Sequence, residues 1–168
     1  STRLLSLYKV YYRVGRVLIV KVTTGIKWGI IYSLIISLIA TGLTYAFIYY
    51  PQLPSLEKEY YQSILNSTGN VTEATLAEKQ VPLFVPAILL YLNVISLLIA
   101  GAVAGFVIAE LWDRNPSWIL KGLMGSIVVL IVIYLIDIAL SPLYFSIPVA
   151  LGIGLLTSFK LYKQDKKS

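Results

Sequence analysis

The sequence predicts an all-α integral membrane protein: a four-transmembrane-helix bundle with an N-terminal basic amphipathic helix and a small exterior helical hairpin. Residues 28–56 and 80–109 contain no Asp, Glu, Lys or Arg, and residues 122–159 contain only Asp137. A helix rises about 1.5 Å per residue and a bilayer core is about 30 Å thick, so roughly 20 apolar residues cross it. The chain is 58% hydrophobic with a mean hydropathy of +0.80, which is far above an ordinary soluble domain.

Residues 1–27 are basic and contain no acidic residue. Lys9, Arg13 and Arg16 are spaced i, i+4, i+7 and therefore share one face of a helix. This spacing predicts an amphipathic helix on the cytoplasmic leaflet, with these three cations in contact with lipid headgroups. The alternative is a basic tail that sets membrane orientation without a particular lipid role.

Each predicted span is bounded by residues that suit a membrane interface. The first ends in tyrosines before Pro51, and the second begins near Pro82 and Pro86. Lys121 lies in the first turns of the third, from where its ammonium group is expected to reach the headgroups. The predicted spans are residues 28–50, 83–109, 117–140 and 143–159.

The basic residues predict the orientation. Six Lys or Arg lie in residues 1–27, two in 110–121 and four in the tail, 160–168, against two in the 51–82 loop. This asymmetry favours a cell-membrane protein with both termini and the 110–116 turn in the cytoplasm. The alternative is three spans, with 122–159 as one tilted helix, but it would be about 57 Å long.

The 51–82 loop is predicted to form the exterior hairpin. Ser55 suits the N-cap of a first helix, residues 66–70 suit a turn, and a second short helix is expected over 72–80. Asn66 and Asn70 each begin an Asn-x-Ser/Thr sequence, which makes them glycosylation candidates on the non-cytoplasmic side. Turn formation alone is the competing explanation for both asparagines.

Small residues follow one face of three predicted spans, at intervals of four. In lipid, such a face lets helix backbones approach closely. We expect helix packing or a subunit contact here, and a polar conduit along the Ser/Thr face of the first span is the alternative. The residues are Gly25, Gly29, Ser33, Ser37 and Thr41, then Gly101, Gly105 and Ala109, and finally Ala150 and Gly154.

Asp137 is the single acidic residue inside a predicted span. A charge at the bilayer centre costs roughly 2.5–3.5 kcal/mol on insertion scales, which makes such a residue a candidate functional site. Because Asp137 lies about one turn from the outer end of its span, a hydrated interfacial carboxylate is the leading interpretation. A proton or cation site with Tyr134 or Asn93 and a contact to a partner subunit are the alternatives, although Asn93 is also expected to form an interhelical hydrogen bond.

Composition excludes several kinds of chemistry. The chain has no Cys and no His, so a disulfide, a His-ligated haem, a Cys/His zinc site and a Ser–His–Asp triad are impossible. We find no phosphate-binding loop and no second intramembrane aspartate, and therefore predict neither a cofactor nor an enzymatic activity. The net charge of +6 is explained by membrane orientation, so we do not expect nucleic-acid binding.

These features predict a structural or accessory subunit of a larger membrane complex, such as a respiratory, transport or virion-membrane assembly. Its expected partners are membrane lipids and other integral membrane subunits or further copies of itself. The alternative function is a small oligomeric transporter or channel that uses Asp137 and the Ser/Thr face of the first span. Several intramembrane polar groups usually line such a pathway, and this chain has few.

Overall fold

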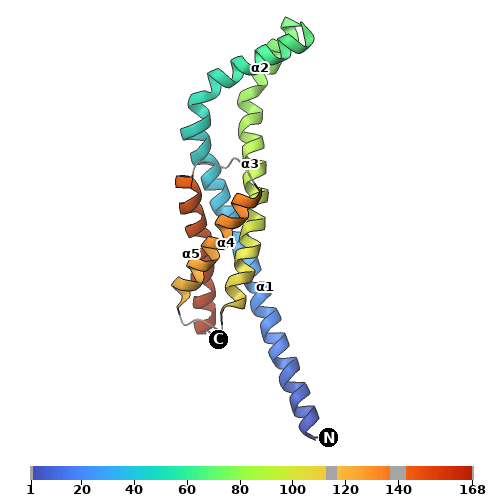
Figure 1. Cartoon of the computed structure of the whole chain (residues 1–168), viewed down its shortest axis with the longest axis vertical. Coiled ribbons are helices and arrows are strands. Elements are labelled where there is room, and N and C mark those ends of the chain that lie inside the picture. Colours follow the sequence, from blue (N-terminus) through green and yellow to red (C-terminus); the bar gives the residue numbers. More distant parts are fainter. Residues whose placement is uncertain (1, 113–116, 137–142, 168) are drawn as a thin grey trace. The chain divides into compact units, whose positions relative to one another are not determined.

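The computed structural model describes residues 2–112, 117–136 and 143–167, with side chains for 22–112, 117–136 and 145–165 (Figure 1). Over these ranges the chain is all helical and has no strand, which confirms the predicted all-α class. The elements in order are α1 (Thr2–Thr44), the π-helical turn η1 (Tyr45–Tyr49), the 3₁₀ turn η2 (Tyr50–Gln52), α2 (Leu53–Thr68), α3 (Val71–Glu110), α4 (Trp118–Ile136) and α5 (Leu143–Lys167).

Four helical stretches are long and apolar enough to cross a membrane, so the chain is a multi-pass membrane protein. The alternative of one long helix over residues 122–159 is wrong, because α4 and α5 are separate helices that pack against each other. The four stretches are Val22–Thr68, Val71–Glu110, Trp118–Ile136 and Phe145–Asp165.

Helix α1 runs without a break through the predicted boundary at residue 27. The interfacial role of residues 1–27 therefore stays a prediction, and the side chains of Lys9, Arg13 and Arg16 lie outside the described residues. The chain also stays helical past residue 50, where the first span was predicted to end. It passes through η1 and η2 into α2, and Pro51 lies in η2.

The predicted helix boundaries in the 51–82 loop are partly wrong. Helix α2 begins at Leu53 with Gln52 as its N-cap, so Ser55 lies inside the helix instead of capping it. Pro54 in the first turn explains the earlier start, since its fixed φ suits a helix and its missing N–H costs nothing there. Gly69 ends α2 with φ 67°, a left-handed conformation that glycine adopts freely.

The predicted short helix 72–80 and the predicted span 83–109 form one helix, α3, with Pro82 and Pro86 inside it. Proline removes one N–H donor but keeps φ near −65°, and helices in a membrane setting tolerate it. Helix α5 likewise continues through most of the predicted tail, to Lys167. Residues 137–140 and 113–116, parts of the predicted third span and cytoplasmic turn, lie outside the described residues.

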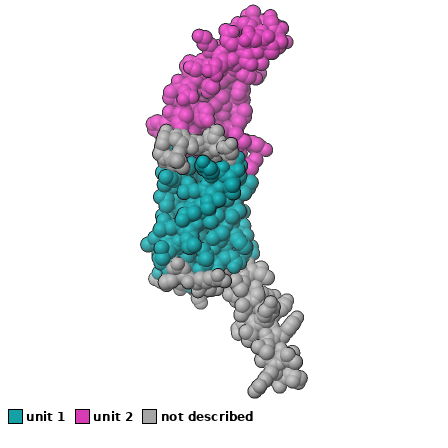
Figure 2. Space-filling view, viewed as in Figure 1, with its two compact units in different colours: residues 1–36, 96–168 teal, residues 37–95 magenta. Residues whose placement is uncertain are grey.

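The chain divides into two compact units (Figure 2). Unit 1 contains residues 1–36 and 96–168, and unit 2 contains residues 37–95. Small and β-branched side chains dominate the core of unit 1, which allows α3, α4 and α5 to lie close together. That core is Leu97, Ala100, Ala104, Val129, Ile133, Ala150 and Ile153, with Ile36 of α1 packed against it.

Candidate functional site

Glycine residues hold α1 and α3 together in unit 1. Gly25 lies against the backbone of Gly105, and Gly29 lies against the backbone of Gly101. A Cβ atom added to Gly25 would come within 2.9 Å of the Cβ of Ala109, a separation that real Cβ atoms do not show. This part of the predicted small-residue face therefore serves a backbone-to-backbone contact within the chain.

A second close contact joins α4 to α5. Gly154 lies against Gly122 and Ser126, and Ala150 is fully buried one turn earlier. The hydroxyl of Ser126 donates to the Gly122 carbonyl of its own helix over 2.8 Å, so it does not leave an unpaired donor in the contact between α4 and α5. Gly122 and Ser126 were not among the predicted packing residues, although their spacing of four residues is that of the predicted small-residue faces.

The polar end of the small-residue face lies in unit 2 and is also buried. The Thr41 hydroxyl donates to the Ser37 carbonyl over 2.7 Å. The Asn93 side-chain amide then donates to Thr41 Oγ1 over 2.8 Å, which links α3 to α1. Ser37 and Asn93 are fully buried, so these groups stabilise a helix contact and line no open surface.

One acceptor in this contact has no protein partner. Asn93 Oδ1 is buried and has no hydrogen bond to any part of the chain that the structure describes. Of the other members of the predicted polar site, Tyr134 belongs to unit 1 and its side chain is 81% exposed. Asp137 lies outside the described residues, so Asn93 is the one member with a described polar contact.

Unit 1 carries a third feature that we call the aromatic end: Trp28, Trp112, Trp118, Leu161 and Tyr162, packed around Ile108. The ring of Trp118 lies 5.0 Å from Phe159 and 6.3 Å from Tyr162, measured between centroids. The hydroxyl of Ser158 donates to the Trp118 carbonyl over 2.5 Å, which ties the start of α4 to α5. The chain's three tryptophans therefore gather at one end of unit 1.

Lys121 is buried in the aromatic end. Its ammonium group does not extend toward the lipid headgroups, contrary to the prediction from its position near the start of the third span. It is 4% exposed, and its Nζ donates to the Trp112 carbonyl over 2.7 Å. The same Nζ lies 3.9 Å from the centroid of the Trp112 ring. The Trp112 carbonyl lies in the turn that follows α3, and this hydrogen bond together with the Trp112 ring stabilises the buried ammonium group.

Trp112 also forms a hydrogen bond to α5. Its indole N–H donates to Asp165 Oδ2 of α5 over 2.8 Å, and the residue is 8% exposed. A tryptophan next to a predicted span is typical of an interfacial anchor, but the Trp112 ring is a buried connection between helix ends. The 53-residue separation from Asp165 is why a local pattern could not indicate this pair.

Asn70 caps α3 in unit 2. Its Oδ1 accepts hydrogen bonds from the backbone N–H groups of Thr72, at 2.9 Å, and Glu73, at 3.3 Å. Turn and capping chemistry is therefore present at this asparagine. Asn66 and Asn70 are both exposed, as a glycosylation acceptor must be.

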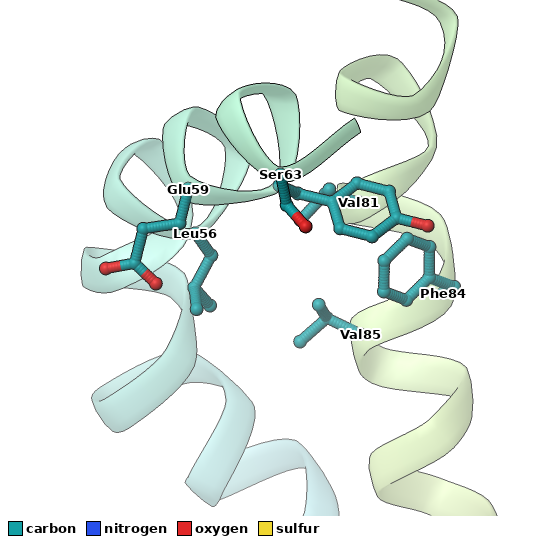
Figure 3. Close-up of a pocket in the computed structure, with 7 residues that line it drawn as sticks. Leu56, Glu59, Ser63, Val81, Phe84 and Val85 are labelled. Atoms are coloured by element: carbon teal, nitrogen blue, oxygen red, sulfur yellow. The ribbon is translucent and has the colours of Figure 1, made fainter. Parts of the chain in front are cut away.

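The hairpin of unit 2 encloses a groove of about 380 Å³ between α2 and α3 (Figure 3). Its walls are mostly apolar, and the rings of Tyr60 and Phe84 meet edge to face with centroids 5.4 Å apart. Glu59 and Ser63 are its polar lining residues.

Within the described ranges, no cluster of three acidic side chains could hold a metal ion. The chain matches no protein-family model, no curated protein and no solved structure. The geometry itself is therefore the basis for a functional proposal.

Proposed function

We propose that this protein is a non-catalytic structural or accessory subunit of a larger membrane complex. One observation carries the proposal: the described side chains of Thr41, Asn93 and Lys121, which could have lined a pathway, take part in helix packing within each unit, while Asp137 lies outside the described residues. Thr41 and Asn93 bond to each other in unit 2, and Lys121 bonds to the Trp112 carbonyl just after α3 in unit 1. A transporter needs polar groups that face a pathway, whereas a subunit that acts by contact does not.

The small-residue faces support this proposal less directly than the sequence suggests. Gly25, Gly29, Gly101 and Gly105 are buried against each other inside unit 1, so they are not free for a partner. What remains for contact is the outer surface, where α1 and α4 expose a series of large apolar side chains. These include Leu34, Ile35, Leu38 and Ile39 of α1, and Leu120, Met124, Ile127 and Ile131 of α4.

Extraction from native membranes in mild detergent tests the proposal. We expect stoichiometric foreign membrane subunits to accompany the full chain, and mass spectrometry identifies them. The matched variants replace an outward leucine by alanine, at Leu120 on α4 or at Leu76, which is exposed on the hairpin. A pure homo-oligomer with an ion flux that Asp137→Asn abolishes would overturn the proposal in favour of the transporter.

We also propose that the termini are cytoplasmic and the hairpin exterior in the cell membrane. The absence of cysteine makes single-cysteine labelling clean. Gln62 of α2 and Gln164 of α5 are both exposed, so Gln62→Cys and Gln164→Cys form a matched pair. We expect a membrane-impermeant maleimide to label only Gln62→Cys in intact cells, and labelling of only Gln164→Cys would invert the topology.

Glycosylation of Asn66 and Asn70 in the native host follows from this topology. It is expected as a gel shift that disappears when both asparagines become glutamine. The Thr68→Ala and Thr72→Ala variants keep both asparagines but destroy both acceptor sequences, so they separate glycosylation from the capping role of Asn70. A native protein with no shift would contradict this part of the proposal.

A further inference from the structure

Two lysines of unit 1 lie over the same aromatic ring where α1 meets α5, and a third lies over another ring of α5. The Nζ atom of Lys160 is 4.5 Å from the centroid of the Trp28 ring, and that of Lys27 is 5.8 Å from the same centroid. The Nζ atom of Lys163 is 4.7 Å from the centroid of Phe159. Two helices thus bring two ammonium groups to the Trp28 ring.

No carboxylate in the described part of the chain pairs with these three amines. Asp165, the described carboxylate nearest to them in sequence, accepts the indole N–H of Trp112. An aromatic face offsets only part of the repulsion between neighbouring ammonium groups, because an exposed cation–π contact is worth about 0.5–1 kcal/mol. An anion placed between Lys27 and Lys160 would therefore be attracted by both amines.

The surface also lies at an apolar boundary on both helices. Lys27 directly precedes the charge-free stretch 28–56, and Lys160 directly follows the stretch 122–159. One turn further into each stretch, Ile30 and Leu156 are exposed. A ligand here would meet cations at one end and exposed hydrocarbon side chains at the other.

We propose that Lys27 and Lys160, both over the Trp28 ring, bind the phosphate headgroup of an anionic phospholipid, with Lys163 one turn further along α5. The ammonium groups attract the phosphate, while acyl chains run along the apolar surface that Ile30 and Leu156 begin. Lysine is a compact point charge without the planar fork of arginine, so the site selects negative charge more than headgroup shape. This proposed lipid site does not rest on the proposed role as an accessory subunit.

Native mass spectrometry of the full chain in detergent tests the site, with phosphatidylglycerol and phosphatidylcholine as probes. We expect Lys27→Gln/Lys160→Gln to weaken phosphatidylglycerol binding about 10- to 30-fold, since each lysine near an anionic surface makes a similar contribution. Lys58→Gln/Lys79→Gln removes the same charge from the hairpin and should leave binding unchanged. Lys27→Arg/Lys160→Arg should retain binding, which shows that charge and not folding is responsible.

Four results would overturn the proposal. Both glutamine variants could lose the lipid equally, which would make the effect one of net charge. Phosphatidylcholine could bind as tightly as phosphatidylglycerol, or Lys27→Gln/Lys160→Gln could bind like the unmodified chain. Inorganic phosphate in excess is expected not to displace the lipid, and displacement would identify a site for a soluble anion instead.

Discussion

Helices α1 and α3 contact each other within both units, and the two contacts use different chemistry. In unit 1, Gly25 and Gly29 lie against Gly105 and Gly101, so backbone meets backbone. In unit 2, a hydrogen bond of 2.8 Å between the side chains of Asn93 and Thr41 links the helices. A glycine contact has no side chain that could rotate away from an added atom. Polar side chains in a membrane can exchange one partner for another, so we expect the glycine contact to be far less tolerant of substitution.

The largest expected effect comes from Gly101→Leu. A Cβ atom at residue 101 would lie 2.5 Å from the Gly29 carbonyl oxygen and 2.7 Å from the Ser33 Cβ. The helices must separate to accept it, and overpacking of this kind costs about 3 kcal/mol or more. A large fall in the midpoint of thermal unfolding in detergent is the measurement.

Gly42→Leu is the matched control, because no atom lies within 4 Å of a Cβ built at that glycine of α1. The control should be neutral, or stabilising by up to about 1 kcal/mol, since glycine is a poor helix former. Equal destabilisation by the two substitutions would show that the glycine contact has no special role.

We expect an intermediate loss of stability for Lys121→Met. This substitution tests a contact made by a charged side chain. The substitution keeps most of the side-chain volume but removes the donor to the Trp112 carbonyl and the ammonium group over its ring. An unpaired buried acceptor costs about 1–3 kcal/mol. We expect a fall in unfolding free energy of that size and a shift in tryptophan fluorescence.

Lys58→Met provides the control for Lys121→Met, because Lys58 is exposed on α2. It should change neither stability nor fluorescence beyond about 0.5 kcal/mol. An unchanged unfolding midpoint in Lys121→Met would mean that water already satisfies the Trp112 carbonyl, and the buried position of Lys121 would then need another cause.

The spans could be predicted from the sequence because charge is excluded from hydrocarbon whatever the fold. The absence of charged residues from 28–56 and 80–109 was therefore sufficient evidence. The buried face of α1 could also be predicted from the sequence, since small residues recur every four positions from Gly25 to Thr41. Periodicity does not reveal which helix lies opposite, and so the choice between an intrachain contact and a subunit contact stayed open.

The aromatic end could not be predicted because its contacts are distant in sequence and depend on side-chain rotamers. Lys121 could reach headgroups or a carbonyl with equal ease, and only the position of the end of α3 decides between them. The merging of residues 72–80 with the second span had a different cause. Pro82 and Pro86 indicate a boundary by local rules, but the helix continues through both.

The smallest effect on stability is expected for the polar contact between Asn93 and Thr41 in unit 2. Asn93 donates to Thr41 but leaves its own Oδ1 buried without a partner in the described chain. Hydrogen bonds between membrane helices average about 0.6 kcal/mol in double-mutant cycles. Asn93→Leu removes the bond and the unpaired acceptor together, so the gain from one change offsets the loss from the other.

A double-mutant cycle with Asn93→Leu and Thr41→Val measures this balance through unfolding in detergent. We expect a coupling free energy of about 0.6 kcal/mol and a nearly unchanged stability for Asn93→Leu alone. A coupling above about 2 kcal/mol would mean that Asn93 Oδ1 is satisfied by a bound water or cation, because only a completed network holds a pair that strongly. The polar contact would then be as intolerant as the glycine contact, and the distinction between the two would fail.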